Sequence, residues 1–274
     1  MHEENVDSFY SSGLDKVDPD DVWPLTYGYW LNENDTYNDA AKQMWDRLYG
    51  SANIVPGESI VVVVAPGMGL ELLHLYRTYL PRKIYGVDIT EEHVKRTRNL
   101  IEKEGLSDFI ELIHGSGTRL NEYINDKVTH VLCVEGTIQM DNRHGFYQSA
   151  RNILVDGGVF GFCDSCVKHY PSGMADGLFK NLISSMWLVP VENMQTPADM
   201  IADLESLNYK IQLSETFGDR VWIPYCNAKL KEFSNDVTKR GMLNAIGLFA
   251  INETLRFGCY FTDNIDYCVI IAVK

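Results

Sequence analysis

The feature that most constrains this chain is the stretch IVVVVAPGMGLELL at 60–73, in which five β-branched residues run into two closely spaced glycines. A strand that is apolar at every position fits a parallel sheet with helices on both faces, because both of its sides are buried. Similar strand patterns, with helical patterns between them, follow at 83–89, 109–115, 130–136 and 159–165. This alternation predicts a Rossmann-like α/β fold.

Helix ends are also marked in the sequence. The helix after the first strand should end before Pro81, and Thr90 is expected to cap the next helix, which closes at Gly105. After residue 165 the alternation is interrupted twice, by an amphipathic segment around 174–188 and a largely helical stretch at 225–256. We interpret these interruptions as a helical lid over the carboxyl edge of the sheet. A helix at 197–207 and strands at 208–216 and 266–274 complete a predicted seven-stranded, mostly parallel sheet.

Composition excludes several classes of function. Lys and Arg number 24 against 38 Asp and Glu, so the net charge of −14 opposes broad contact with a phosphate backbone and no nucleic-acid partner is expected. No apolar run reaches the roughly 18 residues of a membrane helix, and the N-terminus lacks the order of a signal peptide, so a cytoplasmic location without membrane contact is expected. The first twenty residues are polar and acidic and are expected to be mostly disordered.

The six cysteines lie in apolar segments, and Cys163 and Cys166 form the one CxxC pair. A zinc site of paired CxxC motifs is therefore not indicated, and these two thiols are expected to be buried and structural. No metal is predicted.

The glycine turn after the first strand and an acid at the end of the second indicate nucleoside binding. Gly67 and Gly69 allow backbone amides to approach a ligand, and Asp88 follows 19 residues after Gly69, where a carboxylate accepts ribose hydroxyls. A purely structural turn is the alternative. Because Glu71 stands where a third small residue would be needed, a nicotinamide fingerprint is disfavoured.

Four motifs lie between Tyr27 and Ser165: YGYW at 27–30, VVVVAPGMG at 61–69, IYGVDIT at 84–90, and VEGTIQMDNRHGFYQSARNILVDGGVFGFCDS at 134–165. In these motifs the chain resembles the class I S-adenosylmethionine-dependent methyltransferases, especially the small-molecule branch that includes sterol, phosphoethanolamine and natural-product enzymes. The resemblance implies S-adenosyl-L-methionine as cofactor and methyl transfer as activity. It also implies a division into an N-terminal segment with cofactor-covering helices (1–57), a cofactor-binding core (58–165), a lid insertion (166–207) and the remaining strands with a second lid segment (208–274).

The resemblance further implies roles for individual residues. The two loop glycines would pass the methionine part of the cofactor, Asp88 would hold the ribose, Ile89 would pack on adenine, and Glu135 would lie beside the sulfonium. Ser116 falls where the family usually has an Asp for the adenine amino group. The predicted cofactor-binding residues are Tyr29, Gln43, Gly67, Gly69, Glu71, Asp88, Ile89, Gly115, Ser116 and Glu135.

The glycine loop departs from the family pattern D-x-G-x-G-x-G. Ala65 replaces the first acid and Glu71 replaces the last glycine. The carboxylate of Glu71 could accept the cofactor's α-ammonium or pair with a cation across the cleft. Alternatively, it is a solvated residue in the first helical turn, where the helix dipole favours an acid.

The histidine that O-methylating relatives often carry after the fourth strand is missing, because Ile138 and Gln139 occupy those places. Candidates near the carboxyl edge are acids and histidines that could act as general bases, although His144 also fits a surface position. The predicted catalytic residues are Glu135, Asp164, His144 and His169, the last beside Tyr170.

The acceptor is expected to be a small, partly apolar organic molecule, since the predicted lid is rich in aromatic residues, among them Phe179, Met186, Trp187, Trp222, Tyr225, Phe249, Phe257, Tyr260 and Phe261. The missing histidine favours a carbon, nitrogen or acidic oxygen nucleophile. Two alternatives stay open: a protein that binds the cofactor or a ligand without methylating, and one that uses the cofactor in another natural-product reaction such as a cyclisation. A homodimer is also left open.

Overall fold

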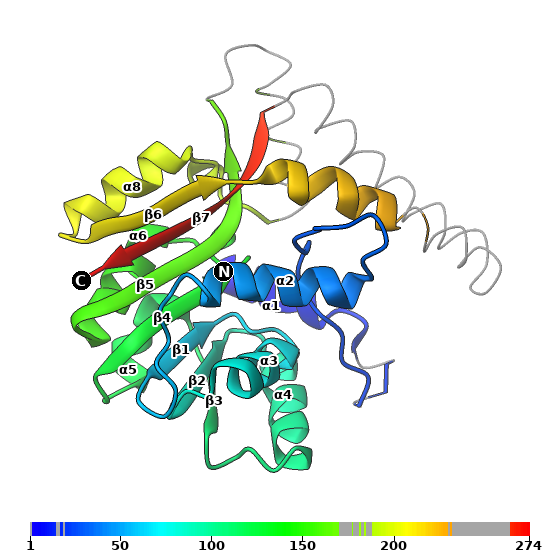
Figure 1. Ribbon diagram of the computed structural model, residues 1–274, viewed down its shortest axis with the longest axis vertical. Coiled ribbons are helices and arrows are strands. Elements are labelled where there is room, and N and C mark those ends of the chain that lie inside the picture. The colour runs from blue at the N-terminus through cyan, green and yellow to red at the C-terminus, as the bar shows by residue number, and fades with distance from the viewer. Residues whose placement is uncertain are drawn as a thin grey trace.

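The computed structural model describes residues 2–14, 17–18, 20–169, 177, 181, 184, 188–229, 231 and 264–274. Its elements alternate between strands and helices along most of the chain (Figure 1). The helices are α1 (His2–Ser11), α2 (Tyr37–Tyr49), α3 (Leu70–Tyr79), α4 (Glu91–Lys103), α5 (Leu120–Tyr123), α6 (Arg143–Ile153) and α8 (Pro197–Ser206). The short 3₁₀ helices are η2 (Gly117–Arg119), η3 (Val191–Asn193) and η4 (Gly218–Arg220). The strands are β1 (Ile60–Val64), β2 (Lys83–Asp88), β3 (Ile110–His114), β4 (Val128–Val134), β5 (Leu154–Val167), β6 (Lys210–Thr216) and β7 (Ile265–Val273).

One seven-stranded sheet organises these elements in the order β3-β2-β1-β4-β5-β7-β6. Strands β1 to β5 are parallel, and β7 runs antiparallel between β5 and β6. The predicted seven-stranded, mostly parallel Rossmann-like sheet is therefore confirmed. The order reverses at β1, so the ends of β1 and β4 form the switch point at which such sheets bind ligands.

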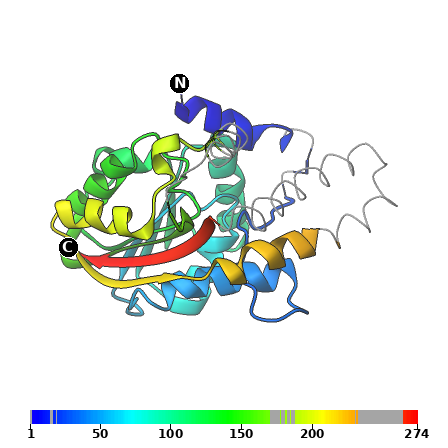
Figure 2. The ribbon, with the colours of Figure 1, turned by 90° about the horizontal axis from the view of Figure 1, so that it is seen from above.

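Helices cover both faces of the sheet, as the fully apolar β1 requires (Figure 2). Val62 and Val64 belong to a core on one face, which α5, α6 and α8 cover. Val61 and Val63 face the opposite core, which is built with α2, α3 and α4. Alternate side chains of one strand thus contribute to two separate cores.

Two sequence-based expectations about element ends need correction. Thr90 is the N-cap residue of α4, but its side chain makes no capping hydrogen bond. Instead the Thr90 amide donates to Asp88 Oδ1 over 2.8 Å. Strand β5 also begins at Leu154, ahead of the predicted 159, because a bulge in its pairing with β4 accommodates the intervening turn.

The expectation that the first twenty residues are mostly disordered is wrong for the described part of this segment. Residues 2–11 form α1, whose Val6 is buried and which contacts α4. The segment after α1 is held by Arg96 of α4, whose buried guanidinium donates to the carbonyls of Leu14 (2.6 Å) and Asp18 (2.8 Å). These long-range bonds order a segment whose own composition is polar.

Most of the helix predicted around 174–188 and most of the stretch at 225–256 lie outside the described residues, although residues 222–229 are helical. The same holds for Tyr170, Phe179, Met186, Trp187, Phe249, Phe257, Tyr260 and Phe261. The predicted lid therefore stays a prediction.

Cys163 and Cys166 are buried free thiols, as expected. Among the described residues no group of three or more His, Cys, Asp or Glu side chains could hold a metal ion. Within the same residues, no helix has the length and apolar character needed to cross a membrane.

Candidate functional site

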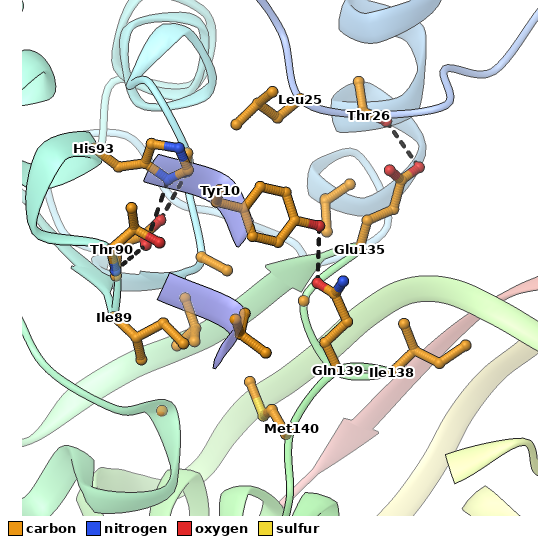
Figure 3. A pocket seen from close by; sticks show the side chains of 18 of the residues that line it. Tyr10, Leu25, Thr26, Ile89, Thr90, His93, Glu135, Ile138, Gln139 and Met140 are labelled. Carbon is orange, nitrogen blue, oxygen red and sulfur yellow. Dashed lines mark hydrogen bonds and ion pairs between the residues drawn. The ribbon is translucent and has the colours of Figure 1, made fainter. Parts of the chain in front are cut away.

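A cavity of about 260 Å³ opens at the carboxyl edge of the sheet, near the ends of β1, β2, β4 and β5 (Figure 3). Its volume is close to the lower end of the roughly 300–1,000 Å³ range of small-molecule sites. The segment before α2 and the first turn of α4 complete its wall. Helix α1 crosses the cavity, and the phenol of Tyr10 reaches over it to donate to Gln139 Oε1 over 2.8 Å.

The loop after β1 is shaped by left-handed backbone conformations. Ala65 has φ 59°, Gly67 has φ 56° and Gly69 has φ 85°. A Cβ at Gly69 would lie 2.5 Å from Thr97 Cγ2, so a larger residue would push the loop away from α4. Because Gly69 has no Cβ, the loop can pack tightly against α4. This packing holds the loop close to the cavity.

Asp88, at the end of β2, holds this loop in place. Its Oδ2 accepts the Gly67 amide over 3.1 Å and its Oδ1 accepts the Thr90 amide over 2.8 Å. Each carboxylate oxygen has a second lone pair, so two acceptor positions remain for a ligand. Asp88 lines the cavity, as do Gly67 and Ile89.

His93 lies beside Asp88 in the first turn of α4. Its Nδ1 is 3.6 Å from Asp88 Oδ1, and the side chain is buried. Its Nε2 has no hydrogen-bond partner among the described residues. The Tyr10 ring meets the His93 ring edge-on, with 5.9 Å between the centroids. An unpartnered buried nitrogen in a cavity wall is unusual and indicates a place where a ligand can supply the missing bond.

Ser116, just beyond β3, also lines the cavity and is paired with α1. Its hydroxyl donates to Glu3 Oε1. The guanidinium of Arg119 lies 3.5 Å from Glu3 Oε2. A carboxylate from the N-terminal helix thus lies at the end of β3, where the family pattern would have an Asp in place of Ser116.

Glu135 follows β4 in a left-handed conformation, with φ 58°. Its carboxyl accepts hydrogen bonds from the Thr26 hydroxyl (2.8 Å), the Tyr27 amide (2.9 Å) and the Tyr267 hydroxyl (2.7 Å). Burial raises the pKa of Glu135 to about 8, although these hydrogen bonds act to lower it. At pH 7 the carboxyl group of Glu135 is therefore mostly protonated, and a cation bound nearby would favour loss of its proton.

Asp164 is the fourth carboxyl group in the cavity wall and is fully buried within β5. Its Oδ2 accepts the Thr137 hydroxyl (2.8 Å) and the Ile138 amide (2.9 Å), and its Oδ1 accepts the Ser165 amide (2.7 Å). Burial raises the pKa of Asp164, and the nearby Arg143 opposes that shift. These bonds hold the carboxyl in one orientation at the cavity wall.

The remaining predicted site residues lie elsewhere. Tyr29, Gln43, Gly69, Glu71, His144 and His169 are not among the described residues that line the cavity. Tyr29 packs edge-on against Phe217, and Gln43 accepts the Leu31 amide. His144 and His169 are exposed. Their predicted roles in binding or catalysis stay predictions.

Glu71 is not solvated, and no cationic side chain among the described residues pairs with it. Its side chain is buried in α3 and accepts a hydrogen bond from the Tyr49 hydroxyl of α2. Burial raises the pKa of Glu71 to about 8. The interpretation as a solvated residue is therefore wrong.

The sequence resemblance assigned residues 1–57 to the covering of the cofactor, but three residues of this segment that reach the cavity were not predicted. Glu3, Tyr10 and Thr26 all line the cavity. The one available signal was the spacing of Val6 and Tyr10, four residues apart on one helical face. The polar and acidic composition of the first twenty residues led instead to the prediction of disorder.

In a comparison with known proteins, residues 62–162 match a family model described as a methyltransferase domain. Over 140 residues the chain is 27% identical to the erythromycin 3''-O-methyltransferase of Saccharopolyspora erythraea, a match that covers 51% of this chain and 45% of that protein. The chain spans less than half the length of the curated relatives it matches.

Two solved structures show the same fold over almost their whole length. The [4+2]-cyclase SpnF has a TM-score of 0.76 at 14% identity, with 99% of this chain and 96% of that chain covered. The geranyl diphosphate C-methyltransferase of Streptomyces coelicolor has a TM-score of 0.73 at 13% identity, with 99% and 97% covered. The expected class I fold is therefore confirmed, and residues 62–162 match a methyltransferase domain, as the sequence resemblance predicted.

Proposed function

We propose that this chain, whose residues 62–162 are a methyltransferase domain in the class I fold, transfers a methyl group from S-adenosylmethionine to a small organic acceptor. The observation that carries this proposal is the cradle in which Asp88, at the end of β2, holds the glycine loop and still faces the cavity. Such a carboxylate suits the two hydroxyls of a ribose.

The charge of the cavity fits this cofactor. Glu3, Asp88, Glu135 and Asp164 line it, and no Lys or Arg belongs to its described lining. S-adenosylmethionine carries a sulfonium and an ammonium group, so carboxylates favour its binding. The unpartnered Nε2 of His93, next to Asp88, offers a further hydrogen-bonding position for a nucleoside.

When bound, the cofactor would supply an electrophilic methyl group. The residues of this chain would align the acceptor with it and exclude water, since an in-line displacement depends mainly on positioning. We assign Asp88 to the ribose, with Gly67, Ile89, Gly115 and Ser116 completing the nucleoside wall. Glu135 and Asp164 lie toward β4 and β5, where they would attract the cationic part of the cofactor and could take a proton from the acceptor.

The acidic groups of the cavity also limit which acceptor molecules can bind. Once the cation of the cofactor has brought Glu135 into its ionised form, an anionic acceptor would be repelled by it, so a neutral or basic molecule is favoured. Apolar and aromatic side chains such as Leu25, Ile138 and Tyr225 also line the cavity, which suits an acceptor with apolar surface.

Calorimetry with S-adenosylhomocysteine tests the first step, and absence of binding at millimolar ligand would refute the proposal. Mass spectrometry of candidate acceptors incubated with S-adenosylmethionine tests the second step. A product heavier by one methylene supports methyl transfer. A product with the mass of the acceptor would instead support a cyclisation, the reaction class named for the structurally similar SpnF.

We further propose that the protein is cytoplasmic. We also propose that the chain is divided into four parts, 1–57, 58–165, 166–207 and 208–274. The proposal also includes a homodimer as the oligomeric state to be tested. Sedimentation velocity would measure that state, and limited proteolysis would test the boundaries at 57, 165 and 207.

A further inference from the structure

We propose that Glu3 of helix α1 accepts a hydrogen bond from the exocyclic amino group of adenine, and so makes the N-terminal helix part of the cofactor site. This inference rests on the proposed function, because it assumes that an S-adenosyl group occupies the cavity. It concerns a residue far in sequence from the methyltransferase domain match at 62–162.

The position of Glu3 relative to Asp88 follows from the sheet. Asp88 pairs with His114 across β2 and β3, and Ser116 lies two residues beyond His114. Because Ser116 donates to Glu3, the Glu3 carboxylate lies at the end of the strand next to Asp88. Adjacent strands are about 4.8 Å apart, so a base attached to a ribose on Asp88 extends to the end of β3.

The chemical character of the two sides of the cavity determines how the cofactor is oriented in it. On the β3 side the lining includes the uncharged Gly115, Ser116, Gly117 and Ile89, and its acid, Glu3, is already paired with Ser116 and Arg119. On the β4 and β5 side the wall carries acidic groups, which suit a cationic chain. The base therefore points toward β3 and the sulfur toward β4.

The Glu3 carboxylate has acceptor capacity left. Oε1 accepts the Ser116 hydroxyl and Oε2 faces Arg119 at 3.5 Å, while each oxygen keeps a second lone pair. The side chain is 34% exposed, so a ligand can reach it. Ser116 cannot replace it as readily, because its hydroxyl proton is given to Glu3 and its oxygen accepts the Thr118 amide over 3.3 Å.

The test compares S-adenosylhomocysteine with its analogue in which hydrogen replaces the adenine amino group. Both are titrated calorimetrically into the full chain and into its Glu3→Ala and Glu3→Gln variants. In the unmodified protein we expect the analogue to bind about 10- to 150-fold more weakly, as for loss of one hydrogen bond to a charged group. Glu3→Ala should weaken S-adenosylhomocysteine by a similar factor and leave the analogue unchanged. Glu3→Gln, which keeps an acceptor oxygen, should recover part of the difference.

Glu4→Ala is the matched control, since Glu4 is an exposed acid on the same helix and does not line the cavity. It should bind both ligands as the unmodified protein does. If Glu3→Ala weakened both ligands equally, or neither, Glu3 would only support the helix or play no part, and the inference would be overturned. If the unmodified protein bound neither ligand, the proposed function itself would fall.

Discussion

The amide of Gly67 donates a hydrogen bond to Asp88 Oδ2 over 3.1 Å, which ties the loop after β1 to the end of β2. Asp88 also accepts the Thr90 amide, so one carboxylate organises the glycine loop and the start of α4. A ligand that uses the remaining lone pairs of Asp88 meets a cradle that is already in position, which lowers the entropic cost of binding.

The Asp88→Asn substitution tests this cradle. The asparagine side chain would offer a single acceptor oxygen and could not satisfy two backbone amides and two hydroxyls. We expect affinity for S-adenosylhomocysteine to fall about 10- to 100-fold. Calorimetry measures the change, and Asp108→Asn, at an exposed position before β3, is the control that should bind normally. Equal affinities for the two variants would contradict the assignment of Asp88 to the ribose.

Tyr10→Phe tests whether α1 holds a bound cofactor in place. The change removes the hydroxyl that bonds Gln139 across the cavity and keeps the ring against His93. Loss of one neutral hydrogen bond of about 0.5–1.5 kcal/mol should speed release of S-adenosylhomocysteine roughly 2- to 10-fold. Stopped-flow displacement measures this rate. An unchanged release rate would mean that α1 does not retain the ligand, and Ser8→Ala on the same helix should have no effect.

Binding should be coupled to release of a proton from Glu135. Burial raises its pKa to about 8 in the unliganded protein, so the carboxyl is mostly protonated at pH 7. A nearby cation favours the ionised form, and S-adenosylmethionine carries a sulfonium and an ammonium group. Its affinity should therefore rise between pH 6 and pH 8, by at most about tenfold per pH unit. Calorimetry at pH 7 in buffers of different ionisation enthalpy counts the protons released. Glu135→Gln should abolish that release, and a wild-type protein that released no proton would contradict the coupling.

Glu71→Gln should change how stability depends on pH. The folded protein keeps the Glu71 proton up to about pH 8, whereas the unfolded chain loses it near 4.5. Between these values the unfolded state binds fewer protons, so the free energy of unfolding falls as pH rises. The glutamine side chain can still accept from Tyr49 but has no proton to lose. We expect the variant to be more stable at pH 8 by about 1–2 kcal/mol, or roughly 2–6 °C in Tm.

Thermal unfolding at pH 5 and pH 8 measures this difference, with the exposed Glu91→Gln as control. Equal pH slopes for Glu71→Gln and the unmodified protein would show that Glu71 is ionised in the fold.

A titration of Glu71→Gln with S-adenosylhomocysteine also tests the predicted contact of Glu71 with the cofactor. Weaker binding would support that contact.

The parallel part of the sheet could be predicted from the sequence because it depends on patterns within short segments. The apolar stretch at 60–64 requires burial on both faces, and the glycines that follow require a tight turn. Asp88 could be placed at the same edge because parallel strands end together. These inferences need only strand direction and side-chain alternation, so they survive without knowledge of distant contacts.

The rest of the site depends on contacts between distant segments. Glu3 meets Ser116, Thr26 meets Glu135, and Tyr49 meets Glu71. No periodicity within one segment encodes such pairs, and the acidic start of the chain even pointed to disorder. Its order arises from Arg96, whose guanidinium donates hydrogen bonds to carbonyls about eighty residues away in sequence.

The sequence by itself determined the sheet, the glycine loop and the nucleoside carboxylate, because each follows from the chemistry of neighbouring residues. Only the tertiary structure decided which acids face the cavity and which are buried behind it. Glu71 lies one turn from the loop glycines but points into the core, while Glu3 lies far away in sequence and reaches the wall. That difference is set by packing and desolvation, which act between elements and leave no local mark in the sequence.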